Sequence, residues 1–284
     1  SWQKTRAKDQ LEVAQAAFDI GNYKLAQKAA RRTVSVWSLS DYAPQAQYLV
    51  ARCYEMEGKD QLAFKRYQEL LEKYPKISNY DEILKRQFEI ANRFLGGQWY
   101  KLWGYVPVPP SMDKTAEMYE KIVKNGPYSD VGPLAQMNIG EAREKQKDYP
   151  EAVRAYERAA DRYADRDPVA SDAMYKTGMA YLKEARTADY DQTVASKAIA
   201  AFSDFKTLHP DDERVSDTDR RIEMLRTEQA RGAYEIAKFY EKRGKWEAAK
   251  IYYNDALNKD RGSPYAEIAR MRIEELNRRT GTNQ

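Results

Sequence analysis

Residues 95–111, LGGQWYKLWGYVPVPPS, hold the densest group of side chains suited to molecular recognition. Tryptophan and tyrosine combine a large apolar ring with a polar N–H or O–H group, and few rotatable bonds must be fixed when they bind. Such side chains are enriched at protein interfaces and at membrane–water interfaces, and the lysine among them suits a carboxylate or a lipid head group. The residues expected to contact a partner here are Trp99, Tyr100, Lys101, Trp103 and Tyr105.

Three prolines follow these aromatic residues, at positions 107, 109 and 110. Because proline fixes φ and lacks a backbone N–H, we expect this part to be extended and short of hydrogen-bond donors. Long apolar loops without a function are uncommon in compact folds. Three interpretations are open: the segment fills a groove of its own protein, docks a partner, or contacts a membrane surface.

The sequence contains few residues suited to catalysis or metal binding. The one histidine, His209, precedes Pro210 at the end of a repeat, and the one cysteine, Cys53, cannot form an internal disulfide. No cysteine and histidine spacing matches a zinc site, no phosphate-binding glycine loop is present, and no acidic run has calcium-loop spacing. We therefore expect neither an enzyme nor a bound cofactor or metal.

Composition favours an all-helical protein, with sparse glycine and proline, 22 tyrosines and 32% charged residues among 284. The 48 basic and 44 acidic residues are interspersed and give a net charge of only +4. Nucleic-acid binding is not expected, because it needs a concentrated basic face. No apolar run approaches the ~20 residues that span a bilayer.

A tetratricopeptide repeat of about 34 residues runs through almost the whole chain. Two helices of a hairpin approach closely only where side chains are small, and an aromatic side chain then fills the gap to the next hairpin. The small position of the first helix falls at Ala14, Ala51, Ala91, Gly140, Gly178 and Ala237. That of the second helix falls at Ala26, Ala63, Thr115, Ala152, Ala198 and Ala249, and four residues later stand Ala30, Tyr67, Tyr119, Tyr156, Phe202 and Tyr253.

These repeats predict an all-α, right-handed superhelix of about six tetratricopeptide hairpins, closed by a C-terminal capping helix. No single hairpin can bury its own apolar stripe, so the hairpins must stack. The predicted modules are an N-terminal one, 1–127, with the aromatic loop and a peptide groove; middle hairpins, 128–210; and a C-terminal docking module, 211–284, with a long helix, the last repeat and the cap.

Two local features are also predicted. The polar segment Glu184–Lys197 is expected to be a solvated loop within the fifth repeat. Ser263 is the expected N-cap of the capping helix, with Pro264 at its first position, where proline is favoured.

First helices line the concave side of such a superhelix, and two rows on them are candidates for peptide binding. One row contains Tyr48 and Phe88, and the row four residues further on is mixed and contains Arg52 and Asn92. Apolar anchors interleaved with polar groups suit an extended or helical peptide. It is equally open that some of these side chains only cover neighbouring helices.

The C-terminal part carries a distinctive series of motifs. An AFxxF…P helix comes first, with Ala201, Phe202, Phe205 and Pro210. A long helix follows, with an RIxxLR element that contains Arg221, Leu225 and Arg226. The turn motif YxxAxFYxxRG completes the series, with Tyr234, Ala237, Phe239, Tyr240, Arg243 and Gly244. This series resembles the BamD-type outer-membrane protein assembly lipoproteins, most specifically over residues 198–257. The chain differs from them in an extra hairpin at 130–164 and in lacking an N-terminal lipobox cysteine, since Cys53 lies inside a helix.

The resemblance implies a non-enzymatic scaffold at the periplasmic face of the outer membrane, lipid-anchored in the full-length protein through a cysteine that is not in this chain. Its C-terminal repeats would hold the periplasmic domains of a BamA-type insertase, and its N-terminal repeats would receive C-terminal segments of unfolded outer-membrane proteins. Those segments end in an aromatic residue, which suits a groove lined by Tyr48, Phe88 and the aromatic loop. For the insertase contact we expect Arg243, Lys245 and Trp246, although Trp246 could equally serve packing.

Two other functions are open. One is a generic cell-envelope tetratricopeptide adaptor that coordinates cell division or peptidoglycan, and a lipobox cysteine upstream would favour the assembly function over it. The other is a chaperone-type protein that clamps C-terminal carboxylates. That function needs a Lys/Asn/Arg set on concave first helices, of which Arg52 and Asn92 form only a part.

Overall fold

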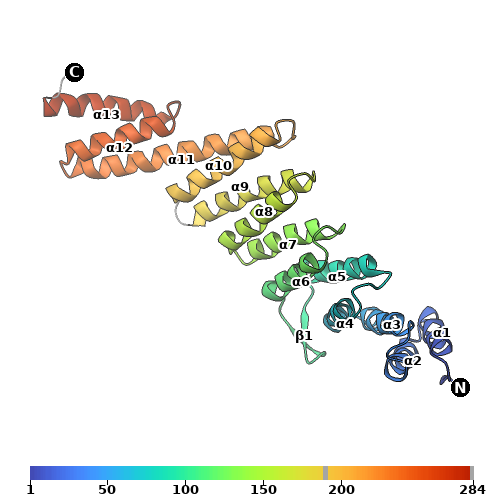
Figure 1. Cartoon of the computed structure of the whole chain (residues 1–284). Coiled ribbons are helices and arrows are strands. Elements are labelled where there is room, and N and C mark those ends of the chain that lie inside the picture. Colours follow the sequence, from blue (N-terminus) through green and yellow to red (C-terminus); the bar gives the residue numbers. More distant parts are fainter. Residues whose placement is uncertain (188–190, 282–284) are drawn as a thin grey trace. The chain divides into compact units, whose positions relative to one another are not determined.

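The computed structural model describes residues 1–187 and 191–281, which form two compact units, Ser1–Gln146 and a second that begins at Lys147 (Figure 1). The first unit contains α1 (Ala7–Asp19), α2 (Tyr23–Val36), α3 (Ala43–Met56), α4 (Asp60–Lys73), α5 (Tyr80–Leu95), β1 (Tyr100–Leu102), β2 (Val106–Val108), α6 (Met112–Asn125) and α7 (Gly132–Lys145). The second contains α8 (Tyr149–Arg162), α9 (Val169–Thr187), α10 (Gln192–Leu208), α11 (Val215–Lys242), α12 (Trp246–Lys259) and α13 (Pro264–Thr280).

Each helix packs against the next along the chain within its unit. Helices two apart also touch at both ends of the array, where α1 contacts α3 and α11 contacts α13. This succession is the tetratricopeptide arrangement and confirms the predicted all-α repeat fold. Among the residues described, no helix combines the length and apolar character needed to cross a membrane.

The predicted small positions are buried. The aromatic residues four positions further on are buried as well, from Tyr67 in α4 to Tyr253 in α12. Four of them contact an aromatic ring from the first helix of their own pair, at centroid distances of 5.9 to 6.1 Å: Tyr67 with Tyr48, Tyr119 with Phe88, Phe202 with Tyr175 and Tyr253 with Tyr234. The repeated core is therefore a small residue beside a pair of rings.

The capping helix begins as predicted. Ser263 is its N-cap and its hydroxyl accepts a hydrogen bond from the Ala266 backbone N–H at 3.2 Å, while Pro264 is the first helical residue. The side chain thereby satisfies one of the N–H groups that the first turn of a helix leaves without a partner.

The prediction of a loop over Glu184–Lys197 is wrong for most of this segment. Helix α9 continues through Thr187, and α10 begins at Gln192; residues 188–190 lie outside the described part. The Asp191 carboxylate caps α10 by accepting from the backbone N–H groups of Thr193 and Val194, at 2.8 and 3.2 Å. Polar composition suggested a loop, but an N-cap followed by helix-forming residues extends the helix into this segment.

Substitution of Gly178 provides a test of the close approach between paired helices. A Cβ there would lie 2.5 Å from Cδ1 of the buried Phe202 ring, so Gly178→Ala is expected to lower the free energy of unfolding by about 1–3 kcal/mol. Thermal and urea unfolding measure the change. Gly232→Ala in α11 is the matched control, because its Cβ would meet only the end of the Gln192 side chain and the helix gains propensity. Equal stabilities of the two variants would contradict this account of the packing.

A cationic and aromatic cavity beside the inserted hairpin

The insertion in the third repeat forms a two-stranded hairpin between α5 and α6 (Figure 1). Strand β1 pairs antiparallel with β2, with Tyr100 opposite Val108, Lys101 opposite Pro107 and Leu102 opposite Val106. The turn contains two successive left-handed residues, Trp103 with φ 53° and Gly104 with φ 83°. Left-handed pairs of this kind match the twist of a tight hairpin.

Tyr100 fixes the base of the hairpin in the helical core. Its buried ring stacks on Phe94 with centroids 4.1 Å apart and an interplanar angle of 10°, and its hydroxyl lies 2.8 Å from Oγ1 of Thr115. Burial raises the pKa of Tyr100, so the phenol keeps its proton. The backbone N–H of Lys101 also donates to Oε1 of Gln61 in α4, at 2.7 Å. The hairpin is thus tied to α4, α5 and α6.

Residues 101–107 of the hairpin are solvent-exposed, in contrast to Tyr100. The exposed fractions are 54% for Trp99, 75% for Trp103 and 75% for Tyr105. Of the predicted recognition residues in this segment, Tyr100 therefore serves the core, and Trp99, Lys101, Trp103 and Tyr105 are left at the surface.

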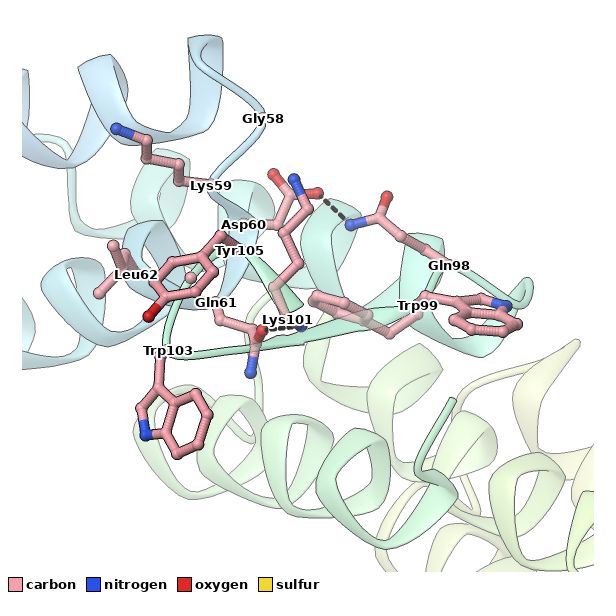
Figure 2. A pocket seen from close by; sticks show the side chains of 12 residues that line it. Gly58, Lys59, Asp60, Gln61, Leu62, Gln98, Trp99, Lys101, Trp103 and Tyr105 are labelled. Atoms are coloured by element: carbon pink, nitrogen blue, oxygen red, sulfur yellow. Dashed lines mark hydrogen bonds between the residues drawn. The ribbon is translucent and has the colours of Figure 1, made fainter. Parts of the chain in front are cut away.

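Two adjoining cavities lie between this hairpin and the α3–α4 turn. The first, of about 580 Å³, we call the aromatic cavity; Phe94, Trp99, Trp103 and Tyr105 contribute to its lining (Figure 2). The second, of about 660 Å³, we call the cationic cavity; its charged lining residues are Arg52, Glu55, Asp60, Arg86, Arg93 and Lys101. Both cavities share Gly58, Asp60, Gln98, Trp99 and Lys101, so a single ligand can occupy both.

Glu55 is the centre of the cationic cavity. Its carboxylate accepts a 2.6 Å hydrogen bond from the Tyr67 hydroxyl and lies 3.3 Å from a guanidinium nitrogen of Arg52. Arg86 and Arg93 approach it less closely, at 3.8 and 3.6 Å. Burial, followed by the charge of Glu55, raises the pKa of Tyr67, which therefore stays a donor. Arg86 is the arginine held least tightly, because its other contact, to Glu89, is 4.0 Å long.

Asp60 is the second carboxylate of this cavity and is only 6% exposed. It is the first residue of α4, where the helix dipole favours a negative charge. Arg93 donates two hydrogen bonds to it, at 2.8 and 3.1 Å, and Gln98 donates a third at 2.9 Å. The hydrogen bond to Asp60 raises the pKa of Arg93.

The charges of this cavity do not balance. Four cationic side chains, Arg52, Arg86, Arg93 and Lys101, face two carboxylates, Glu55 and Asp60. An excess of two positive charges beside an exposed indole suits an anion with an apolar or aromatic neighbour.

The other N-terminal residues predicted for binding are engaged within the unit. The Tyr48 hydroxyl donates to Glu82 at 2.7 Å, and burial, followed by this bond, raises the pKa of Tyr48 to about 12. Phe88 packs on Tyr119. The side-chain oxygen of Asn92 accepts from Tyr119 at 2.6 Å and from Asn138 at 3.1 Å. Arg52 is the one of this group that the structure brings to the cavity, so a role in peptide binding for the others stays a prediction.

The predicted insertase residues lie at the α11–α12 turn of the second unit. The Arg243 guanidinium sits 3.5 Å from the centre of the Phe239 ring, and that ring is 49% exposed. Lys245 is exposed at the N-cap of α12. Trp246 is half-buried against the C-terminal core and carries the Arg279 guanidinium 5.9 Å from its ring. Trp246 thus packs on this core, and Phe239 adds exposed apolar surface; the insertase contact of Arg243, Lys245 and Trp246 stays a prediction.

Sequence reasoning missed Arg86, Arg93, Glu55, Asp60 and Gln98. One signal was available, because Arg86 and Arg93 are seven residues apart and so lie on one face of α5. The histidine gives no sign of catalysis: His209 ends α10, packs on Phe205 and lies 3.8 Å from Asp167. Across the described residues, no group of three or more His, Cys, Asp or Glu side chains could hold a metal ion.

Paired helices that meet at small residues and aromatic rings define a tetratricopeptide-repeat protein, and a tetratricopeptide family model matches residues 11–76. A second family model, described as outer membrane lipoprotein (YfiO), matches residues 111–284, more than half of the chain. The chain belongs to this family of outer membrane lipoproteins. The predicted resemblance to BamD-type proteins is thereby confirmed.

Individual relatives are distant. The chain is 22% identical over 172 residues to the outer membrane protein assembly factor BamD of Caulobacter vibrioides, and this alignment covers 61% of the chain and 56% of that relative, little more than half its length. Among solved structures, a TPR repeat-containing protein of Cytophaga hutchinsonii is 14% identical, with a TM-score of 0.42 over 94% of this chain and 88% of its own. A tetratricopeptide repeat protein of Parabacteroides merdae is 11% identical, with a TM-score of 0.38 over 95% and 98%.

The inserted hairpin falls between the two segments that the family models match, 11–76 and 111–284. Family membership therefore carries no information about residues 95–110. What the two cavities bind must be argued from their own chemistry.

Arg93 is expected to be structural, because its removal leaves the nearly buried Asp60 carboxylate with Gln98 alone among side chains. Arg93→Ala should lower the free energy of unfolding by about 2 kcal/mol, measured by urea unfolding. Adding Asp60→Asn should recover part of the loss by removing the orphaned charge. Arg66→Ala, which breaks an exposed pair with Glu69, should change stability by less than about 0.5 kcal/mol. An Arg93→Ala protein as stable as the parent would refute the role given to this pair.

Proposed function

We propose that this protein is a non-enzymatic scaffold of outer-membrane protein assembly at the periplasmic face of the outer membrane. In this proposal the first unit receives C-terminal segments of unfolded barrel proteins, and the second unit docks the periplasmic domains of a BamA-type insertase. Membership in the outer membrane lipoprotein family supports the general role. The observation that carries the client site is the joined cationic and aromatic cavity at the inserted hairpin.

The cavity suits the end of a polypeptide chain that finishes in an aromatic residue. The terminal carboxylate would lie among Arg86, Arg93 and Lys101, where the Arg86 guanidinium offers paired N–H donors and Arg93, bonded to Asp60, adds positive charge. The last side chain would lie in the aromatic cavity beside Trp99, with rings placed for stacked or edge contacts. Because the two cavities share Trp99 and Lys101, the acid and the ring can belong to one residue.

The hairpin does not support recognition by addition of a third strand. The N–H of Lys101, which points out of the two-stranded sheet, is already bonded to Gln61. Its partner across the sheet, Pro107, has no N–H to offer on the other edge. Client binding would therefore depend on side chains in the cavities, which makes it sensitive to point substitutions.

For the insertase contact, the surface around Arg243 is the best candidate of the second unit. Ile236 and Phe239, one turn apart on α11, are 41% and 49% exposed. Arg243 covers one face of the Phe239 ring, an arrangement of an apolar anchor and a cation that is common at protein interfaces.

The client site predicts binding of a short labelled peptide that ends in phenylalanine with a free carboxylate, measured by fluorescence anisotropy. Amidation of the peptide should weaken binding by about tenfold or more, because a charge-assisted contact is lost. Trp99→Ala/Arg86→Ala should weaken binding of the free acid similarly and should remove most of the difference between acid and amide. Glu55 keeps Arg52, Arg93 and Tyr67 in this variant, so folding should persist.

Leu39→Ala/Arg66→Ala is the matched control, since it also removes one arginine and one exposed apolar side chain of the same unit. It should bind both peptides as the parent does. Equal affinities of the parent for acid and amide would rule out the carboxylate contact, and no binding of either peptide would rule out the client site.

A pull-down from detergent-solubilised envelope tests the division of labour. Trp99→Ala/Arg86→Ala should lose barrel clients and keep the insertase, whereas Phe239→Ala/Arg243→Ala should lose the insertase and keep the clients. Mass spectrometry of the captured proteins, with circular dichroism to establish equal folding, provides the measurement. Recovery of cell-division or peptidoglycan proteins in place of an insertase would favour the generic envelope adaptor instead.

A further inference from the structure

The tip of the hairpin, residues 102–106, is a cluster of exposed apolar side chains. Trp103 and Tyr105 are each 75% exposed, Leu102 is 44% exposed and Val106 38%. The remaining residue is Gly104, so the tip carries no charged side chain. Exposing such residues to water is unfavourable, and a cluster of them marks an interaction site.

Trp103 also stands in a backbone conformation that does not suit it. Its φ of 53° is left-handed, a region that bulky residues rarely occupy and that glycine and asparagine enter easily. Asn-Gly is the usual sequence where two successive hairpin residues are left-handed, but here the sequence is Trp-Gly. Local stability thus disfavours a tryptophan at this position, and the strain calls for an explanation outside the hairpin itself.

The tip has the composition of a segment that enters a membrane–water interface. It combines Trp103 and Tyr105, whose rings carry a polar group, with two apolar residues, and it has no charge that would have to leave water. Two of its backbone N–H groups are satisfied internally, from Gly104 to the Lys101 carbonyl at 3.4 Å and from Tyr105 to that of Leu102 at 3.3 Å. Backbone N–H groups that enter a lipid layer find little water to bond with, so they must be hydrogen-bonded within the protein, as these two are.

The position of polar groups agrees with insertion to the depth of the lipid head groups. Trp and Tyr keep an N–H or O–H for the polar layer while their rings enter the apolar one. Lys101, directly before the tip, is exposed and can meet a phosphate. The base of the hairpin is held by Tyr100, so the tip is presented already ordered.

We propose that residues 102–106 insert into the interfacial layer of a phospholipid membrane, with Trp103 and Tyr105 as the anchors. This membrane contact goes beyond the scaffold function. Trp103 and Tyr105 also line the aromatic cavity, so vesicle binding is measured without client peptide. It gives the first unit an attachment to the bilayer that is separate from any lipid anchor.

The test uses the whole chain and vesicles of phosphatidylethanolamine and phosphatidylglycerol at physiological salt, with flotation to measure the partition coefficient. The parent should float with the vesicles. Trp103→Asn/Tyr105→Ser should lower its partition coefficient at least about tenfold, an effect of lost aromatic anchors. The same variant should unfold at a temperature no lower than the parent, because Asn-Gly fits the left-handed pair.

Ile20→Ser/Leu39→Ser is the control, since it removes two apolar residues that are 80% and 99% exposed in the same unit. It should bind vesicles as the parent does. The proposal is overturned if the parent does not float, if the tip variant floats equally well, or if high salt alone releases the parent, which would assign binding to charges. A dimer of the parent that the tip variant abolishes, seen by light scattering without vesicle binding, would assign the tip to a second copy and also overturn the proposal.

Discussion

The close approach of paired helices at small residues is the constraint on which the rest of this protein depends. Eleven of the twelve predicted small positions are Ala or Gly, and the exception is Thr115 in the repeat that carries the hairpin. Thr115 is small enough for the helix contact, and its hydroxyl meets that of Tyr100. The repeat therefore departs from its rule at the position that seats the insertion, so hairpin and helices form one packed structure.

A second constraint is electrostatic. Glu55 and Asp60 are drawn into the space beside the hairpin, and a carboxylate that leaves water must be paired and hydrogen-bonded. Arg52, Arg93, Gln98 and the Tyr67 hydroxyl meet that need. Arg86 and Lys101 are not needed for this pairing. Their positive charge is left over, and it makes the surface of this ion-pair network attractive to anions.

The helical array was predictable because its information is periodic and local. A small residue recurs at each hairpin, and the Ser263-Pro264 start of the last helix is encoded in two adjacent residues. The errors arose where composition was used instead, as at Glu184–Lys197, whose polar residues are mostly helical. The strands of the hairpin, YKL and VPV, have three residues each. An alternation of apolar and polar residues, which predicts a strand, cannot be recognised over so short a segment.

The candidate site was predictable in part, through the aromatic residues that one short segment brings together. Its charged half was not, because Arg86 and Arg93 on α5 meet Glu55 on α3 and Asp60 on α4 only after the helices stack. Pairwise rules along one helix do not describe contacts between helices. Tyr100 was wrongly grouped with the surface residues for a different reason. Its sequence context does not distinguish it from Trp99 and Trp103, which are exposed, whereas Tyr100 is buried in the core.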